Sequence, residues 1–187
     1  YRTCSYAALL HKTSGTLVLA FNTHVENAHA EAKDGGTRLI VERMKALQKK
    51  YTALGYGENI AVFCTADYNC KPGSTGYQNM ASGFSDMRLI ADSLGSDINQ
   101  ITCHGYGSSA SIIDHIFLDP RGANPVYYKV CAEQINGGYI SDHYTVYGIL
   151  GLETRNIGGI VGYNNGLVSD CFTLGTVKKS LNAGGII

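Results

Sequence analysis

Hydrophobic and polar residues follow one another in patterns that predict alternating strands and helices. Apolar residues dominate segments 5–10 and 16–21, which flank a polar turn and so predict a β-hairpin. Between residues 37 and 54 apolar side chains recur at a spacing of about 3.6, with charged residues on the other face, as in an amphipathic helix. The short apolar run 60–64 predicts a buried strand. This order predicts a strand-helix-strand crossover in which the helix covers a sheet.

Weaker patterns follow in the second half of the chain. A turn at residues 71–74 predicts a short helix that continues to about Ala81, and a second weak helical pattern covers residues 85–94. Further apolar or alternating runs predict strands at 101–106, 111–118, 127–132 and 144–150. Together these elements predict a layered α/β domain.

Composition changes near residue 150, and the change predicts a second segment there. Glycine is enriched in the chain, and many of the glycines lie from Gly148 onward. The motif Gly158-Gly159-Ile160 recurs 26 residues later as Gly184-Gly185-Ile186. We therefore expect one domain over residues 1–150 and a truncated glycine-rich repeat over residues 151–187.

The charge balance excludes a globally attractive surface for anionic polymers. Lys and Arg number 15, as do Asp and Glu, so an anionic substrate must be held by local groups. No run approaches the ~18 apolar residues of a membrane-spanning helix. The cysteines include no Cys-x-x-Cys pair, which argues against a structural zinc site and leaves disulfide pairing open. The chain begins at Tyr1 without Met or a leader pattern, as expected of a processed or cut end.

Four polar clusters stand at the ends of predicted strands and carry the candidate chemistry. They are Asn22-Thr23-His24, Asp67-Tyr68-Asn69, Asp114-His115 and Ser141-Asp142-His143. Because each adjoins an apolar β-type run, strands could deliver all four to one edge of a sheet. Carboxylate, amide and imidazole groups at one edge are the components of a metal-dependent phosphoester hydrolase.

Most of these clusters also have a purely structural interpretation. Asp67 and Asn69 face the same way in an extended segment, so Asp67 could orient a water or bind a metal while Asn69 donates to a phosphoryl oxygen. An Asx turn would place the same two residues there. His143 could be a metal ligand, a proton carrier or a phosphate-binding cation, with Asp142 as an oxygen ligand, or both could belong to an ordinary polar loop. His24 could donate to phosphate or simply lie on the surface.

Asp114 gives a stronger indication of a site. It lies inside an apolar run, and an unpaired buried carboxylate is costly, so it requires a partner. His143 is the natural candidate. Tyr68, Tyr77 and Tyr106 could flank the site and stack on a base or sugar, although tyrosines at strand ends more often pack in the core.

In this order and spacing the clusters resemble the motifs of the endonuclease/exonuclease/phosphatase superfamily, which read Asn-Thr-His, Gly-Asp-Phe-Asn, an Asp in an apolar strand, and Ser-Asp-His. The resemblance extends over about residues 3–150, with Ala66 in place of the family's Gly. It implies an α+β fold, part of a four-layer α/β/β/α sandwich. It also implies a divalent ion, Mg²⁺ or Mn²⁺, that polarises a phosphoryl oxygen during in-line attack by water.

The resemblance implies roles for individual residues. His24 would contact phosphate, and Asp67 would orient the attacking water. Asn69 would help to hold the metal-bound phosphoryl group. Asp142 would ligate the metal, together with Asp67 and Asn69.

The same resemblance pairs Asp114 with His143 and implies that part of the site lies elsewhere. Family members begin with a strand that bears an Asn and a strand that ends in a metal-binding Glu, and neither pattern precedes Asn22-Thr23-His24 here. Glu26 and Glu31 lie downstream of it and are not substitutes. We therefore expect this chain to be the second half of such a domain, and expect the 187 residues alone to show no turnover of a phosphodiester with Mg²⁺. Measurable turnover would contradict this expectation.

The tail from Asn156 resembles the glycine-rich GLUG repeat of bacterial surface and secreted proteins, which implies export, and a flexible linker is the alternative. The leading hypothesis is therefore a secreted or surface-attached, metal-dependent phosphohydrolase that acts on a nucleic acid, a phospholipid or a sugar phosphate. A catalytically inactive binding or adhesion module on the same fold is the second hypothesis. A Cys/His protein that binds zinc is the third.

Overall fold

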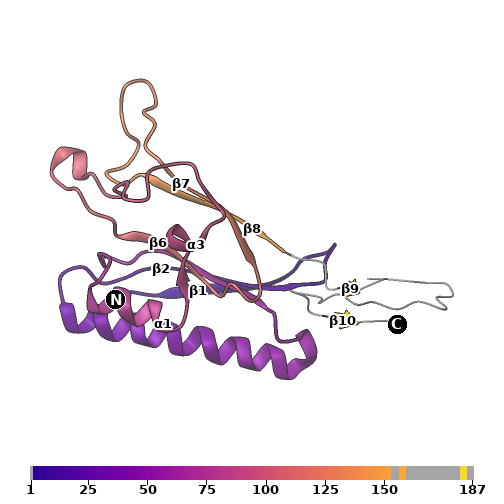
Figure 1. Ribbon diagram of the computed structural model, residues 1–187. Coiled ribbons are helices and arrows are strands. Elements are labelled where there is room, and N and C mark those ends of the chain that lie inside the picture. The colour runs from indigo at the N-terminus through magenta and orange to yellow at the C-terminus, as the bar shows by residue number, and fades with distance from the viewer. Residues whose placement is uncertain (1, 153–155, 159–181, 185–187) are drawn as a thin grey trace.

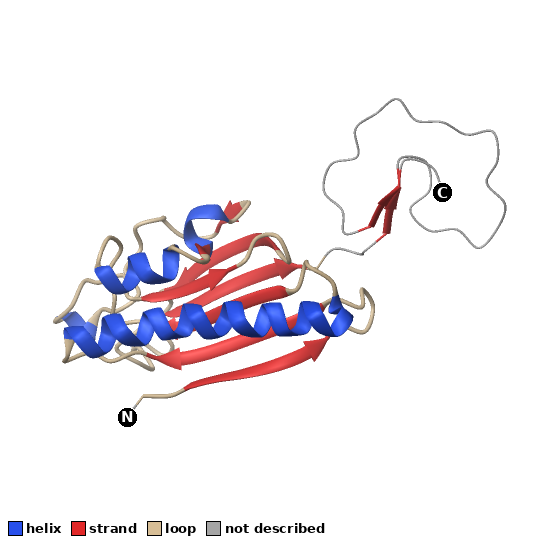
Figure 2. Cartoon of the chain, turned by 90° about the horizontal axis from the view of Figure 1, so that it is seen from below, coloured by secondary structure: helices blue, strands red, loops and turns tan. Residues whose placement is uncertain are grey.

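The computed structural model describes residues 2–152, 156–158 and 182–184, and two β-sheets within it pack face to face. The larger sheet has five strands in the order β1-β2-β3-β6-β4, and the smaller has three in the order β5-β7-β8. Helices cover the outer face of the larger sheet (Figure 1, Figure 2). The layers therefore follow one another as helices, large sheet and small sheet, which agrees with the predicted mixture of α and β layers.

The large sheet contains both the predicted hairpin and the predicted crossover. Its strands are β1 (Cys4–Leu10), β2 (Leu17–His24), β3 (Ala61–Asp67), β6 (Asp114–Leu118) and β4 (Ser85–Asp86). β1 and β2 are antiparallel, whereas β2 pairs in parallel with β3. β6 runs antiparallel to β3, and β4 pairs with the other side of β6. The parallel pair is connected by α1 (Ala30–Tyr51), which lies along one face of the sheet (Figure 2).

The remaining elements are shorter. The small sheet consists of β5 (Ser93–Leu94), β7 (Asn124–Cys131) and β8 (Thr145–Gly151). The other helical segments are a π-helical turn (Thr52–Tyr56), α2 (Thr75–Ala81), α3 (Met87–Ile90) and a 3-10 turn (Gly105–Gly107). β9 (Asn156–Gly158) and β10 (Asn182–Gly184) pair in parallel, with Gly158 opposite Gly184. Most of the expected glycine repeat lies outside the described residues. Within the described ranges, no helix combines the length and the apolar character needed to cross a lipid bilayer.

Apolar side chains fill both faces of the large sheet. In β2, buried residues such as Leu19 and Phe21 face α1, while Asn22 and His24 face the other way. The core on the helix side joins these strand residues to Ile40, Val41 and Met44 of α1 and to Val62, Cys64 and Phe117 of the neighbouring strands. A second core between the sheets contains Met87, Ile116, Leu118, Tyr128 and Val130. Burial on both faces explains why β3 and β6 read as continuous apolar runs.

Two helices differ from the sequence-based predictions. α1 begins at Ala30, well before the predicted start at residue 37, because its first turns are partly exposed and have no apolar periodicity to detect. The predicted helix over 85–94 is wrong: this segment contains β4, the single turn of α3, and β5. The Asp86 side chain accepts a hydrogen bond from the Arg88 N–H at 3.0 Å, so it ends the strand and caps the short helix.

The predicted strand over 101–106 is also wrong. Cys103 makes isolated bridges, and every residue of the turn Gly105–Gly107 has a positive φ, which cannot continue a strand. The next strand begins at Asp114 and not at residue 111. The N–H groups of Ile113 and Asp114 instead both donate to Thr102 Oγ1 at 3.0 Å, so this segment is held by a side chain before the ladder begins.

Gly122 lies directly against the backbone of Ile60, the residue before β3. A Cβ at Gly122 would lie 2.0 Å from the Ile60 carbonyl oxygen, and a backbone atom cannot rotate away as a side chain can. We expect Gly122→Ala to lower the free energy of unfolding by about 1–3 kcal/mol, the usual cost of overpacking, as measured by urea denaturation. Gly138→Ala is the matched control, because a Cβ there meets no atom within 4 Å. Equal destabilisation in the two variants would contradict the packing argument.

Candidate active site

Three neighbouring strands of the large sheet carry polar side chains at one edge. The register pairs His24 with Asp67 and Asp67 with Asp114, so the three residues form a row across β2, β3 and β6. The parallel strands β2 and β3 both end at this edge, whereas the antiparallel β6 begins there. Alternation along each strand turns the three side chains to the face away from α1. As candidate catalytic residues, His24, Asp67 and Asp114 are called the catalytic row.

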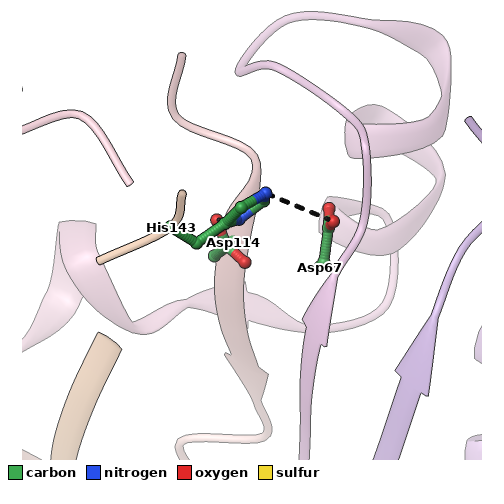
Figure 3. A group of neighbouring side chains, drawn as sticks. All are labelled: Asp67, Asp114 and His143. Atoms are coloured by element: carbon green, nitrogen blue, oxygen red, sulfur yellow. Dashed lines mark hydrogen bonds and ion pairs between the residues drawn. The ribbon is translucent and has the colours of Figure 1, made fainter. Parts of the chain in front are cut away.

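His143 joins this row from the loop that precedes β8 (Figure 3). Its Nδ1 lies 2.8 Å from Asp114 Oδ2, so the expected pairing of these two residues is observed. Its Nε2 lies 3.9 Å from Asp67 Oδ2, and His24 Nε2 lies 3.3 Å from the same oxygen. The Asp67 carboxylate therefore lies between two imidazoles. The His24 side chain is 53% exposed and that of His143 is 25% exposed, so His24 has more freedom to turn toward a ligand.

Backbone hydrogen bonds hold the His143 loop in place. Tyr144 N donates to Thr102 O at 2.7 Å, and His104 N donates to Asp142 O at 2.9 Å. The His143 N–H donates to Ser141 Oγ at 3.1 Å. The loop is thus tied to the segment just before β6, which brings His143 beside Asp114.

The segment after β3 forms the Asx turn that was one interpretation of its sequence. Asp67 Oδ1 accepts a hydrogen bond from Asn69 N at 2.8 Å, and Asn69 has a φ of 50°. Asn69 Nδ2 donates to Val25 O at 3.0 Å, and among the described residues no group donates to Asn69 Oδ1. The turn therefore fixes both side chains and leaves Asn69 Oδ1 without a hydrogen-bond donor among the described residues. The structural and the functional interpretation of this cluster are compatible.

Burial and charge shift the pKa of both members of the Asp114–His143 pair upward. Burial raises the pKa of Asp114, and this effect exceeds the opposing hydrogen bonds from Thr102 and His143. Burial alone would lower the pKa of His143, but the hydrogen bond to Asp114 and the charges of Asp114, Asp67 and Asp142 outweigh it and raise that pKa. His143 therefore holds a proton more readily than a free imidazole does. The hydrogen bond at Nδ1 leaves Nε2 directed toward Asp67.

All six residues expected at the site line one cavity of about 480 Å³. They are His24, Asp67, Asn69, Asp114, Asp142 and His143. Arg2 and Asn27 line it as well and were not expected, because neither belongs to a recognisable motif. Of the three tyrosines considered for stacking, Tyr68 and Tyr77 are buried in the core, and Tyr106 is 69% exposed but does not line this cavity.

The side chains of this cavity suit a divalent cation. Asp67, Asp114 and His143 each offer one ligand atom, and these atoms lie within 4.8 Å of one another. This group differs from the expected set of Asp67, Asn69 and Asp142. Asp114 and His143 are hydrogen-bonded to each other, whereas Asn69 Oδ1 and the Asp142 carboxylate face the same cavity without an ion-pair partner among the described residues. Carboxylate and amide oxygens are the donors that a hard cation prefers.

A buried polar cluster braces the site from the helix-covered face, and the sequence did not indicate it. The His115 side chain is fully buried, with Nε2 2.9 Å from Cys70 O and Nδ1 3.3 Å from Asp86 Oδ2. Tyr77 donates to Asp86 Oδ2 at 3.0 Å, and Arg88 Nη2 lies 3.5 Å from the same oxygen. Cys70 directly follows Asn69, so this cluster anchors the turn that presents Asp67 and Asn69. The short segment 85–88 gave no sign of it, because the contacts of Asp86 with Tyr77 and His115 join it to other segments of the chain.

No protein-family model and no curated protein sequence matches the chain. Solved structures do match. An endonuclease/exonuclease/phosphatase from Bacteroides vulgatus is 23% identical with a TM-score of 0.68, and the match covers 81% of this chain and 56% of that one. The mannosyl-6-phosphatase Bt3783 of Bacteroides thetaiotaomicron is 25% identical with a TM-score of 0.61, covering 80% and 57%. A truncated Caenorhabditis elegans TDP2 is 15% identical with a TM-score of 0.56, covering 78% and 58%.

These matches show that the chain has the fold of endonuclease/exonuclease/phosphatase proteins. The chain spans somewhat more than half of the length of these neighbours, between 56% and 58%. The fold expected from the order of the motifs is therefore confirmed at the level of its α/β layers.

Asp86 provides a test of the buried cluster that braces the site. Burial raises its pKa, but the hydrogen bond and charge of His115 and the charge of Arg88 outweigh burial and hold this pKa below the ordinary value. The ionised carboxylate therefore stabilises the fold above the ordinary carboxyl pKa, and this contribution is lost as the pH falls through the lower folded value. We expect Asp86→Asn to lower the free energy of unfolding by about 3–5 kcal/mol at pH 7.

Measuring the free energy of unfolding at low pH as well tests the direction of the Asp86 pKa shift. The difference between the wild type and Asp86→Asn should narrow as the pH falls from 7 to below the ordinary carboxyl pKa, because the wild type loses the ionised carboxylate there. Asp97→Asn is the control, since the side chain of Asp97 accepts one hydrogen bond, from the N–H of Asn99, in an exposed loop. A difference that stays constant across this range would show that the charge of Asp86 does not stabilise the fold.

Proposed function

We propose that the protein that contains this chain hydrolyses phosphate esters in a metal-dependent reaction with water. The observation that carries the proposal is the catalytic row at one sheet edge, with His143 paired to Asp114 beside it. Carboxylates and imidazoles that share a cavity can orient water, carry protons and neutralise phosphate charge. Two of the fold neighbours named above support the substrate class: one is a mannosyl-6-phosphatase, and the other is an endonuclease/exonuclease/phosphatase. A nucleic acid, a phospholipid or a sugar phosphate would each present the required ester.

Asp67, Asn69 and Asp142 would hold the cation, Mg²⁺ or Mn²⁺. When bound, such an ion supplies positive charge that polarises a phosphoryl oxygen. These residues fit the role because they contribute oxygen atoms that line one cavity.

The residues of the row, together with Asn69 and His143, have separate roles in the reaction. Asp67 accepts a proton from the attacking water, and the N–H of Asn69 holds this carboxylate in one orientation. His143, whose raised pKa favours the protonated form, donates from Nε2 to a phosphoryl oxygen while Asp114 holds Nδ1. His24 is exposed and binds a second phosphoryl oxygen. In-line attack then forms the bond from water oxygen to phosphorus and breaks the bond from phosphorus to the ester oxygen, which takes a proton from solvent and leaves as the alcohol.

Three further parts of the proposal concern the protein beyond this site. The division into a domain over 1–150 and a repeat over 151–187 follows from the change in composition. The likeness of the tail to GLUG repeats supports a secreted or surface-attached protein. The alternative is a catalytically inactive binding module on the same fold. It is less consistent with a catalytic row in which every side chain is an imidazole or a carboxylate that can transfer a proton or bind an ion.

Substitutions in the row test the proposal directly. We expect Asp67→Asn and His143→Ala each to lower kcat for a phosphate ester by at least about 10²-fold, the scale of losing a proton-transfer group, in the protein at its natural length. His11→Ala is the matched control, because His11 is an exposed histidine in the turn at the opposite end of β2. Rates near that of the wild type in either row variant would refute the assignment.

Metal removal tests the cation. We expect chelation to abolish turnover and Mg²⁺ or Mn²⁺ to restore it. Asp142→Asn should raise the Mg²⁺ concentration for half-maximal activity by about tenfold or more, because one anionic ligand is lost. Full activity in the presence of a chelator, or one tightly bound zinc per chain by elemental analysis, would argue against this cation.

A further inference from the structure

A second cavity of about 570 Å³ opens beside the one that holds the catalytic row. The two cavities have Asn27, Asn69, Asp142 and His143 in common, so they adjoin at the residues that would contact the phosphoryl group. A group esterified to a phosphate above the row can therefore extend into the second cavity. Its volume lies in the range of small-molecule sites.

The wall of this second cavity carries two ammonium groups and two carboxylates, in addition to the His143 imidazole. Lys33 and Lys71 line it together with Asp34 and Asp142, and Ser74, Ser109 and Ser111 add hydroxyl groups. Lys33 Nζ donates to Asn69 O at 3.0 Å, which connects this ammonium group to the Asx turn that follows β3. In the described part of the chain, neither lysine and neither of these carboxylates is within ion-pair distance of an opposite charge. Lys33, Lys71 and Asp34 therefore keep hydrogen-bonding capacity for a ligand, whereas Asp142 is assigned to the cation.

This mixture of groups matches a ligand that both donates and accepts hydrogen bonds. Each hydroxyl group donates one hydrogen bond and accepts others, so it can meet a carboxylate and an ammonium at the same time. A second phosphate offers only acceptors at neutral pH, so it could bind the two ammonium groups but would be repelled by the Asp34 carboxylate. The cavity is therefore suited to an uncharged, hydroxyl-rich group.

The same wall is poorly suited to a nucleobase or an acyl chain. Bases in single strands are held by stacking on aromatic side chains, and among the described residues that line this cavity the His143 imidazole is the only aromatic ring, which the Asp114 hydrogen bond already fixes. Its apolar contribution is confined to Gly76, Cys103 and Ile113, too little for a lipid tail. The chain as a whole has a formal net charge of +0, so it lacks the positive field that dominates binding to nucleic acids.

We propose that the second cavity binds the sugar or other polyol of the phosphate ester, with Lys33, Lys71 and Asp34 holding its hydroxyl groups. This inference rests on the proposed function for the position of the phosphoryl group. It narrows the three substrate classes that the sequence left open to sugar or polyol phosphates.

Kinetics with matched substrates test the proposal on the protein at its natural length. The leaving group of glucose 6-phosphate is a sugar with several hydroxyl groups. The leaving group of methyl phosphate is methanol, which carries no further hydroxyl group. We expect kcat/KM to favour glucose 6-phosphate, and expect Lys71→Ala and Asp34→Asn each to lower the ratio of the two kcat/KM values by about tenfold, as for a lost hydrogen bond to a charged group. Lys50→Ala is the matched control, because Lys50 lies in the last turn of α1 while Lys33 lies near its start, roughly 25 Å away at 1.5 Å per residue.

Two results would overturn the inference. One is a ratio that neither Lys71→Ala nor Asp34→Asn changes, with both variants folded by circular dichroism. The other is a kcat/KM for a single-stranded DNA oligonucleotide or for phosphatidic acid vesicles that exceeds the value for glucose 6-phosphate.

Binding separates failure of this inference from failure of the proposed function. Calorimetric titration of glucose 6-phosphate into the Asp67→Asn protein needs no turnover. We expect the affinity to fall about tenfold in Lys71→Ala/Asp67→Asn but not in Lys50→Ala/Asp67→Asn. This result would support binding of the sugar in the second cavity even if the protein hydrolysed no ester. In that case only the proposed reaction would fail. No detectable binding of the sugar phosphate, while methyl phosphate is still hydrolysed by the wild type, rejects the inference and leaves the proposed reaction intact.

Discussion

The parallel pairing of β2 with β3 is the constraint on which the rest of the site depends. α1 connects the two strands and packs its apolar face, including Met44, on them, so both strands must end at the same edge. The register then places His24 opposite Asp67, and the antiparallel β6 adds Asp114 to the same row. Side chains alternate along a strand, so a shift of one residue in β3 would turn Asp67 into the helix-covered core.

The two faces of the sheet support each other through adjacent residues. Asp114 faces the cavity, whereas its neighbour His115 faces the helices and is fully buried. His115 contacts the carbonyl of Cys70, which directly follows the turn that presents the candidate ligands. A buried carboxylate such as Asp86 is tolerated because His115, Tyr77 and Arg88 surround it. The geometry of the cavity edge is thus maintained by contacts on the opposite face.

The distribution of charge is local, because the chain as a whole has no net charge. Carboxylates gather around the two imidazoles of the site, and their field raises the pKa of His143. Selection then depends on the walls of the cavities and not on long-range attraction. One cavity is lined by the carboxylate, amide and imidazole groups that the proposed reaction requires, and the adjoining cavity offers mixed donors and acceptors.

The elements with strong local patterns could be predicted from the sequence alone. They are the hairpin, the long helix, β3 and the polar clusters at strand ends. Local pattern was enough there, because apolar periodicity and strand-ending residues act within a few positions of one another. It failed over residues 85–106, where Asp86 caps a single turn and positive φ values interrupt the chain. The tertiary structure confirmed the predicted contact of His143 with Asp114, but the burial of His115 beside Asp86 and the mixture of charges in the second cavity were visible in it alone. These depend on packing between segments distant in sequence, and no short-range pattern encodes which side chains that packing brings together.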